Sequence, residues 1–112
     1  MTRLRKLVTL LAACAFPLLV ATPASASVDG HCGKYICVMT AHHNRFVQDI
    51  TVQTRDGLRG TLRASWGDYH SGRVNAASHR WEVGYEQAHA KKVCGSLERD
   101  GRSIEDRVCV TI

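Results

Sequence analysis

The chain has 112 residues, a formal net charge of +5 at pH 7 and five cysteines. A chain of this length accommodates one small domain. No apolar run in it reaches the roughly 20 residues that a membrane-spanning helix needs. The sequence therefore excludes an integral helical membrane protein.

The first 26 residues have the three parts of a secretory signal peptide, in the usual order. Basic residues near the N-terminus precede an apolar run from Leu7 to Val20, and small residues at Ala24 and Ala26 suit signal peptidase. We expect cleavage after Ala26 and secretion of residues 27–112 into an oxidising extracellular compartment. The Ala-Ser-Ala ending and the arginine-rich chain that follows are typical of secreted bacterial proteins.

A second interpretation of the leader concerns Cys14. The segment Leu11-Ala12-Ala13-Cys14 resembles a lipoprotein cleavage box, which would anchor the chain through a lipid on Cys14. The apolar run continues past this cysteine, whereas a lipoprotein turns polar there. We therefore favour the secretory interpretation.

Loss of the leader lowers the charge of the exported domain. Three of the 15 basic residues lie in the leader, which leaves 12 basic against 10 acidic residues and a net charge of +2. Basic and acidic residues are interspersed along residues 27–112. This pattern predicts no nucleic-acid footprint, and the lack of a second apolar run predicts no membrane attachment after cleavage.

The cysteine count of the exported domain predicts two disulfides. Cys14 leaves with the leader, and an even number remains: Cys32, Cys37, Cys94 and Cys109. Four cysteines allow three pairings. A domain this small buries only about 60–65% of its unfolded surface, so cross-links compensate for a thin core.

Alternation of apolar and polar residues with a period of two dominates residues 27–112 and indicates half-buried strands. We expect an all-β fold, a small antiparallel two-sheet sandwich of immunoglobulin-like or Greek-key type with six or seven strands. Segment 86–92 has helix-forming composition, but its length allows at most one helical turn. The domain has no proline, so we expect its edge strands to be protected by charges, with these candidates: Arg45, Arg63 and Arg107.

The sequence predicts one hairpin in the middle of the domain. Apolar residues alternate in segments 46–53 and 61–66, and Arg55-Asp56-Gly57 between them is a good three-residue hairpin loop with Gly57 in the left-handed region. This loop would place Ile50 opposite Leu62 and Phe46 opposite Trp66, with the apolar side chains on one face.

A second hairpin is predicted at the C-terminus. Pairing Cys94 opposite Cys109 places both apolar rows on one face, with the turn near Gly101-Arg102, and a slip of one residue would separate the cysteines. This register favours a Cys94–Cys109 disulfide and leaves Cys32–Cys37 as a local loop. The alternative is a pair of long-range bridges from Cys32 and Cys37 to the C-terminal hairpin.

These features predict a small secreted, non-catalytic, monomeric binding module for an extracellular protein or polysaccharide partner. Segment 67–78 is polar and glycine-containing, and we expect it to form the longest exposed loop. Trp66 and Trp81 are expected to face the core, and Tyr69 to be exposed. The side chains predicted to bind the partner are Asp68, Tyr69, His70 and Arg73.

Two alternative functions remain open at the level of sequence. The first is a secreted hydrolase such as a nuclease, with Glu82 and His89 as acid and base. The second is an antimicrobial or toxin-like effector, which a net charge of only +2 makes less favourable. Asp68, His70 and Ser71 lie too close together in one loop for a hydrolytic triad. The six histidines show no metal-ligand spacing, so we expect neither a metal nor another cofactor.

Overall fold

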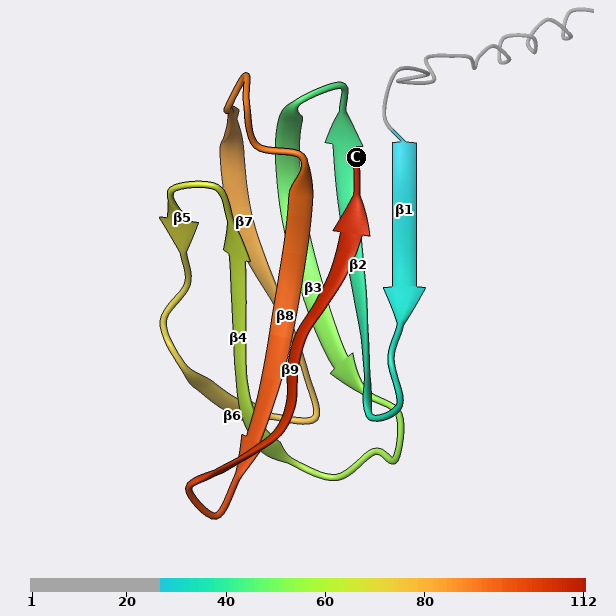
Figure 1. The fold of residues 1–112 in the computed structure, drawn as a ribbon, viewed down its shortest axis with the longest axis vertical. Helices are drawn as coiled ribbons and strands as arrows, with labels where there is room; N and C mark the ends of the chain where they lie inside the picture. The colour runs from blue at the N-terminus through green and yellow to red at the C-terminus, as the bar shows by residue number, and fades with distance from the viewer. Residues whose placement is uncertain (1–26) are drawn as a thin grey trace, which may run out of the picture.

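The computed structural model of the protein describes residues 27–112, so the predicted signal peptide and Cys14 lie outside the described residues. Along this range the chain forms nine β-strands and no helix (Figure 1). The strands are β1 (Ser27–Cys32), β2 (Ile36–His43), β3 (Phe46–Thr54), β4 (Gly60–Trp66), β5 (Tyr69–His70), β6 (Val74–Ala76), β7 (Ser78–Glu86), β8 (Lys92–Arg99) and β9 (Arg102–Thr111).

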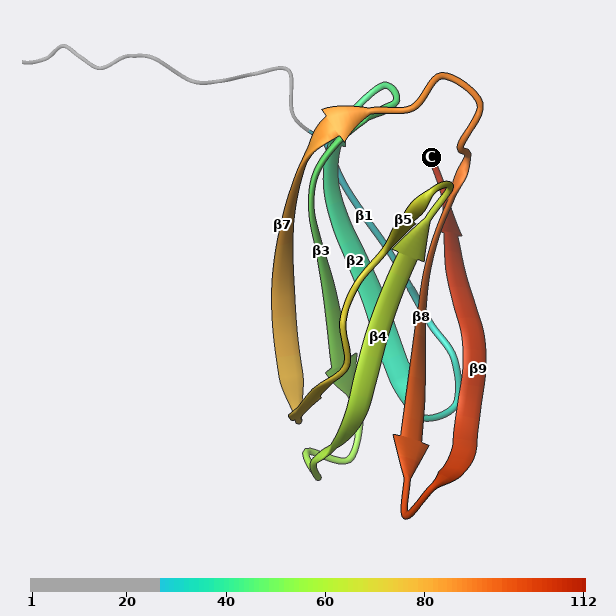
Figure 2. The same cartoon turned by 90° about the vertical axis from the view of Figure 1, so that its left-hand side faces the viewer.

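The strands form two antiparallel sheets that pack face to face. Sheet A has the order β1-β2-β3-β7, and sheet B has the order β5-β4-β8-β9 with β6 also paired to β4. Figure 2 shows the two layers edge-on, with β7, β3 and β2 in one layer and β4, β8 and β9 in the other. The prediction of a small all-β, antiparallel two-sheet sandwich with two disulfides is confirmed.

The core lies between the sheets and follows from the alternation of apolar residues along β2, β3, β4, β8 and β9. Gly95 of sheet B lies directly against side chains of sheet A. A Cβ atom added there would lie 2.7 Å from Val52 Cγ2 and 2.8 Å from Val38 Cγ2. The buried apolar side chains are Ile36, Val38, Val47, Ile50, Val52, Leu62, Ala64, Trp66, Val93, Leu97, Val108 and Val110.

The predicted C-terminal hairpin is confirmed. Strands β8 and β9 pair with Cys94 opposite Cys109, and the turn between them contains Gly101 at φ 75°. Both predicted disulfides are present, Cys94–Cys109 and Cys32–Cys37, and the second closes the hairpin of β1 and β2. The alternative of long-range bridges to the C-terminal hairpin is therefore wrong.

The predicted hairpin between residues 46–53 and 61–66 is wrong, because β3 and β4 belong to different sheets. Gly57 does adopt a positive φ of 77°, yet the loop crosses from sheet A to sheet B. Arg99 holds this crossing. Its guanidinium donates to both carboxylate oxygens of Asp56, at 2.8 and 2.9 Å, and also to the carbonyl groups of Leu58 and Arg59. These hydrogen bonds with Arg99 lower the pKa of Asp56 to about 2.

Phe46 also departs from its predicted position. Val47 is fully buried, whereas Phe46 is 40% exposed on the outer face of sheet A. The register of β3 against β7 shifts between Val47 and Asp49, so the alternation inverts at this irregularity. A β-bulge has this effect because one extra residue moves the following side chains to the opposite face.

Segment 67–78 is less open than predicted. It contains β5 and β6, which both pair with β4, so only the connections around them remain loops. Strand β6 takes up three residues of the predicted loop, Val74–Ala76. Segment 87–91 connects β7 to β8 without forming a helix, although Ala90 N donates to Gln87 O at 3.3 Å and closes a single turn.

Glu105 joins β9 to the turn between β1 and β2. Its carboxylate accepts hydrogen bonds from the backbone N–H groups of Lys34 and Tyr35 at 2.7 Å and of Ile36 at 2.9 Å. Partial burial raises the pKa of Glu105, but these three hydrogen bonds outweigh it and hold the pKa below its usual range. The carboxylate thereby ties the edge of sheet B to the edge hairpin of sheet A.

Candidate functional site

The outer face of sheet B carries a row of small and polar side chains that runs across four strands. Trp66 on β4 and Val93 on β8 point into the core, so their neighbours Ser65 and Cys94 point outward. Ser65 pairs with His70 of β5 on one side and with Cys94 of β8 on the other, and Cys94 pairs with Cys109 of β9. This row forms the floor of the candidate site.

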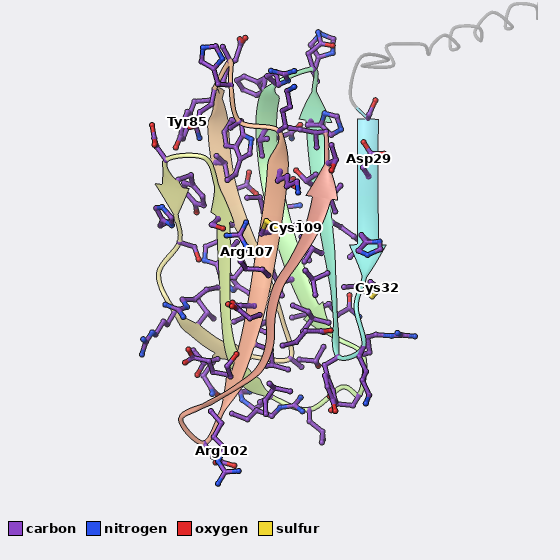
Figure 3. All side chains as sticks on the ribbon, viewed as in Figure 1. Asp29, Cys32, Tyr85, Arg102, Arg107 and Cys109 are labelled. Carbon is purple, nitrogen blue, oxygen red and sulfur yellow. A yellow bond between two sulfur atoms is a disulfide. The ribbon has the colours of Figure 1, made fainter. Side chains whose placement is uncertain are left out.

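A β-bulge in β9 places Arg107 over this floor. Leu97 pairs with Glu105 and Gly95 pairs with Val108, so Ser96 faces two residues, Asp106 and Arg107. Arg107 has a φ of 57°, in the left-handed region that costs a non-glycine residue roughly 1–2 kcal/mol. Its Nη2 atom lies 3.9 Å from Sγ of Cys94. Figure 3 shows Arg107 beside Cys109, midway along sheet B.

Two adjoining depressions follow this surface. The first has a volume of about 250 Å³ and lies between β4, β5, β8 and the bulge of β9. The second, of about 360 Å³, continues it toward segment 87–91. They share Ser65, His70, Cys94 and Arg107, so they form one continuous shallow groove.

Positive side chains dominate this groove, which we call the basic groove. One carboxylate, Asp106, accompanies them. Arg63 is held by Glu98 in an ion pair of 3.1 Å, whereas within residues 27–112 no carboxylate pairs with Arg107, Lys91 or Lys92. The side chains that carry or can accept a positive charge are Arg63, His70, His89, Lys91, Lys92 and Arg107.

Segment 87–91, which carries His89 and Lys91, is fastened to β4. Gln87 donates through Nε2 to the carbonyl of Trp66 at 2.7 Å and accepts from the N–H of Asp68 at 2.9 Å. The indole Nε1 of Trp66 donates to the carbonyl of Ala90 at 3.2 Å. These contacts give the end of the basic groove a defined position relative to sheet B.

The four side chains predicted to bind a partner do not all lie in the basic groove. His70 lines the basic groove, while Tyr69, the preceding residue in β5, points to the inner side, with its ring centroid 6.5 Å from that of Tyr85. Tyr69 is half-buried, and burial followed by the proximity of Tyr85 raises its pKa. Asp68 borders an adjoining depression that shares Gly67, His89 and Ala90 with the basic groove, and Arg73 is exposed in the loop between β5 and β6.

Sequence reasoning missed most of the basic groove. Arg63 and Arg107 were expected only to protect edge strands, and Lys92 was assigned no role. The charges are interspersed along the chain, and pairing of strands distant in sequence brings them together. No local pattern in the sequence predicts the β-bulge that places Arg107 on the outer face of sheet B.

The candidate hydrolytic residues do not meet. Glu82 lies on the outer face of sheet A, where it pairs with Arg80 at 2.6 Å, whereas His89 lies at the end of the basic groove on sheet B. Ser71 Oγ accepts from the N–H of Ala64 at 2.8 Å and donates to the carbonyl of Gly72 at 2.9 Å. This hydroxyl therefore fastens a loop to β4.

The histidines are spread over the domain. Across the described part of the chain, no group of three or more His, Cys, Asp or Glu side chains is placed to hold a metal ion. His42 is nearly buried, and its ring nitrogens lie 2.6 Å from Asp29 Oδ2 and 3.0 Å from the carbonyl oxygen of Asn44. This contact fastens β1 to β2 at the end opposite the Cys32–Cys37 disulfide.

Comparison of the chain with protein-family models, with curated proteins and with solved structures gives no match. Within residues 27–112 no helix is long and apolar enough to cross a membrane. The geometry and charge of the described surface are therefore the features that bear on function.

Proposed function

We propose that this protein is a secreted, non-catalytic binding module that holds an anionic extracellular ligand in the basic groove. The observation that carries the proposal is the gathering of six positive or protonatable side chains around a continuous groove that contains one carboxylate. A positively charged surface of this kind steers an anionic ligand toward it and holds the ligand's anionic groups through charge-assisted hydrogen bonds.

The backbone of Arg107 supports a binding role for its side chain. A left-handed arginine costs stability, and strained residues of this kind cluster at functional sites. A guanidinium group that is held over a disulfide without a carboxylate partner remains available to a ligand. The two disulfides support an extracellular location because such bonds persist in oxidising compartments.

The test is titration of the exported domain, residues 27–112, with fluorescently labelled dextran sulfate, with neutral dextran as the reference polymer. We expect dextran sulfate to bind and its affinity to fall as ionic strength approaches about 0.15 M, where the Debye length is about 8 Å. Neutral dextran is expected not to bind.

Substitution of Arg107 locates the site. Arg107→Gly removes the guanidinium and also removes the left-handed strain, so we expect affinity to fall about tenfold, the equivalent of about 1.4 kcal/mol. The free energy of unfolding should stay within about 1 kcal/mol of the wild type or rise. An arginine with a purely structural role would instead give a less stable variant with unchanged affinity.

Two control variants separate the groove from general charge and backbone effects. Arg102→Ala removes one positive charge at the far tip of the β8–β9 hairpin, which Figure 3 shows well away from Arg107. Asp100→Gly relieves a left-handed φ of 53° in the same turn. We expect both variants to bind dextran sulfate as the wild type does. Equal losses for Arg102→Ala and Arg107→Gly would contradict a localised site.

A further inference from the structure

The positive groups of the basic groove are too far apart for one small anion to bridge them. From His70 on β5 to Cys94 on β8, over which the Arg107 guanidinium lies, is two strand spacings, about 10 Å. From Ser96, the partner of Arg63, to Lys92 is four residues along β8, about 13 Å. A ligand that engages all of these groups must carry several anionic groups along its length.

The lining chemistry argues against nucleic acids and proteins. Among the residues that line the two depressions there is no Trp, Tyr, Phe, Leu, Ile, Val or Met. Proteins that bind single-stranded nucleic acids stack the bases on aromatic side chains. Protein partners are commonly anchored by large buried side chains that fill apolar pockets. The basic groove offers charge and hydrogen bonds in place of such anchors.

The carboxylate of Asp106 can accept hydrogen bonds from a ligand that carries donor groups. An ionised carboxylate only accepts hydrogen bonds, and within residues 27–112 no side chain forms an ion pair with Asp106. Ser65 and Ser96 place hydroxyl groups along the same floor, and these both donate and accept. The matching ligand therefore carries anionic groups together with hydroxyl donors.

We infer that the ligand is a linear acidic polysaccharide whose carboxylates contact the arginine, lysine and histidine side chains and whose hydroxyl groups contact Asp106 and the two serines. This inference rests on the proposed function and adds the class of ligand. An acidic peptide such as polyglutamate supplies carboxylates and backbone N–H donors but no side-chain hydroxyl groups. A highly sulfated polymer places negative charges opposite Asp106 at more positions along its length.

The experiment compares two polymers that carry carboxylates, polygalacturonate and poly-L-glutamate, by titration calorimetry at one ionic strength. For the wild type we expect polygalacturonate of matched charge to bind at least fivefold more tightly. Single-stranded DNA is a third arm and is expected to bind more weakly than polygalacturonate. Tighter binding of polyglutamate or of DNA would overturn the inference.

Asp106→Ala tests the role of the carboxylate. We expect polyglutamate affinity to rise because a repulsive charge is lost, while polygalacturonate affinity stays level or falls because an acceptor is lost. The ratio of the two affinities should therefore fall at least fivefold. An equal rise for both polymers would show that Asp106 acts through charge alone and would overturn the inference.

Ser65→Ala combined with Ser96→Ala provides a second test, which removes two hydroxyl groups and changes no charge. We expect weaker binding of polygalacturonate and unchanged binding of polyglutamate. Failure of this inference is distinguishable from failure of the proposed function. If Arg107→Gly weakens both polymers but neither the serine variant nor Asp106→Ala alters their ratio, the groove binds anions without selecting sugars. If Arg107→Gly weakens neither polymer, the groove is not the site.

Discussion

The two disulfides join directly opposed cysteines of neighbouring strands, yet they lie in contrasting surroundings. Cys94 is only 4% exposed, beneath Arg107 in the middle of sheet B, whereas Cys32 is exposed at the end of an edge hairpin in sheet A. One disulfide belongs to the floor of the basic groove, and the other fastens β1 to its neighbour. The same covalent link therefore lies beneath the proposed binding surface in one region and fastens a strand end in the other.

Removal of each disulfide is the change with the largest expected effect. Replacing Cys94 and Cys109 by alanine should lower the free energy of unfolding by about 3 kcal/mol, and replacing Cys32 and Cys37 by about 2 kcal/mol, because the second loop is shorter. Urea denaturation measures both losses. Dextran sulfate should bind more weakly only to the first variant, and equal loss of binding would remove the distinction between the two regions.

Gly95→Ala tests whether the floor of the groove depends on sheet A beneath it. The added methyl group would meet Val52 and Val38 at less than 3 Å, and overpacking of this kind costs about 2 kcal/mol. Thermal unfolding should show the loss. Gly72→Ala is the matched control, since nothing lies within 4 Å of the added atom there. A Gly95→Ala variant with unchanged stability would show that the two sheets accommodate the added methyl group at no cost in free energy, and would contradict this prediction.

Glu105→Gln tests the connection between the two regions and has the smallest expected effect. Loss of the charged acceptor of three backbone N–H groups should cost about 1 kcal/mol at neutral pH. Glu82→Gln, which removes an exposed ion pair with Arg80, should cost almost nothing.

The pH dependence of the Glu105 contribution follows from its lowered pKa. The folded state binds the proton more weakly than the unfolded chain, so the contribution is fully present above the unfolded-state pKa of about 4.5. It is lost as the pH falls through the lower folded-state pKa. The difference in stability between wild type and Glu105→Gln should therefore be constant from neutral pH to about pH 5 and shrink below that. A difference that grows in acid would contradict this assignment.

The C-terminal hairpin shows what local sequence information predicts well. The alternation of residues, the turn at Gly101 and the requirement that Cys94 face Cys109 all specify one register, and the structure has it. The middle hairpin had comparable local signals, but its prediction was wrong. There, Asp56 and the carbonyl groups that follow it bind Arg99, which is 43 residues away in sequence, and the loop crosses to the other sheet.

The candidate site was predictable only in small part. Of the side chains that the sequence predicted to bind a partner, His70 lines the groove, whereas alternation along β5 places Tyr69 on the opposite face. Arg63 and Lys92 come from β4 and β8, and their proximity depends on strand pairing that residue order does not show.

The sequence by itself determined the strand-rich composition and most of the apolar positions of the core, and it favoured the disulfide pairing that the structure has, because these depend on period-two alternation and on spacing within short segments. Only the tertiary structure decided which strands share a sheet, the inversion at Phe46 and the gathering of positive charge on one face. Each of these features depends on contacts between distant segments or on a single bulged residue, and such causes produce no periodic pattern in the sequence.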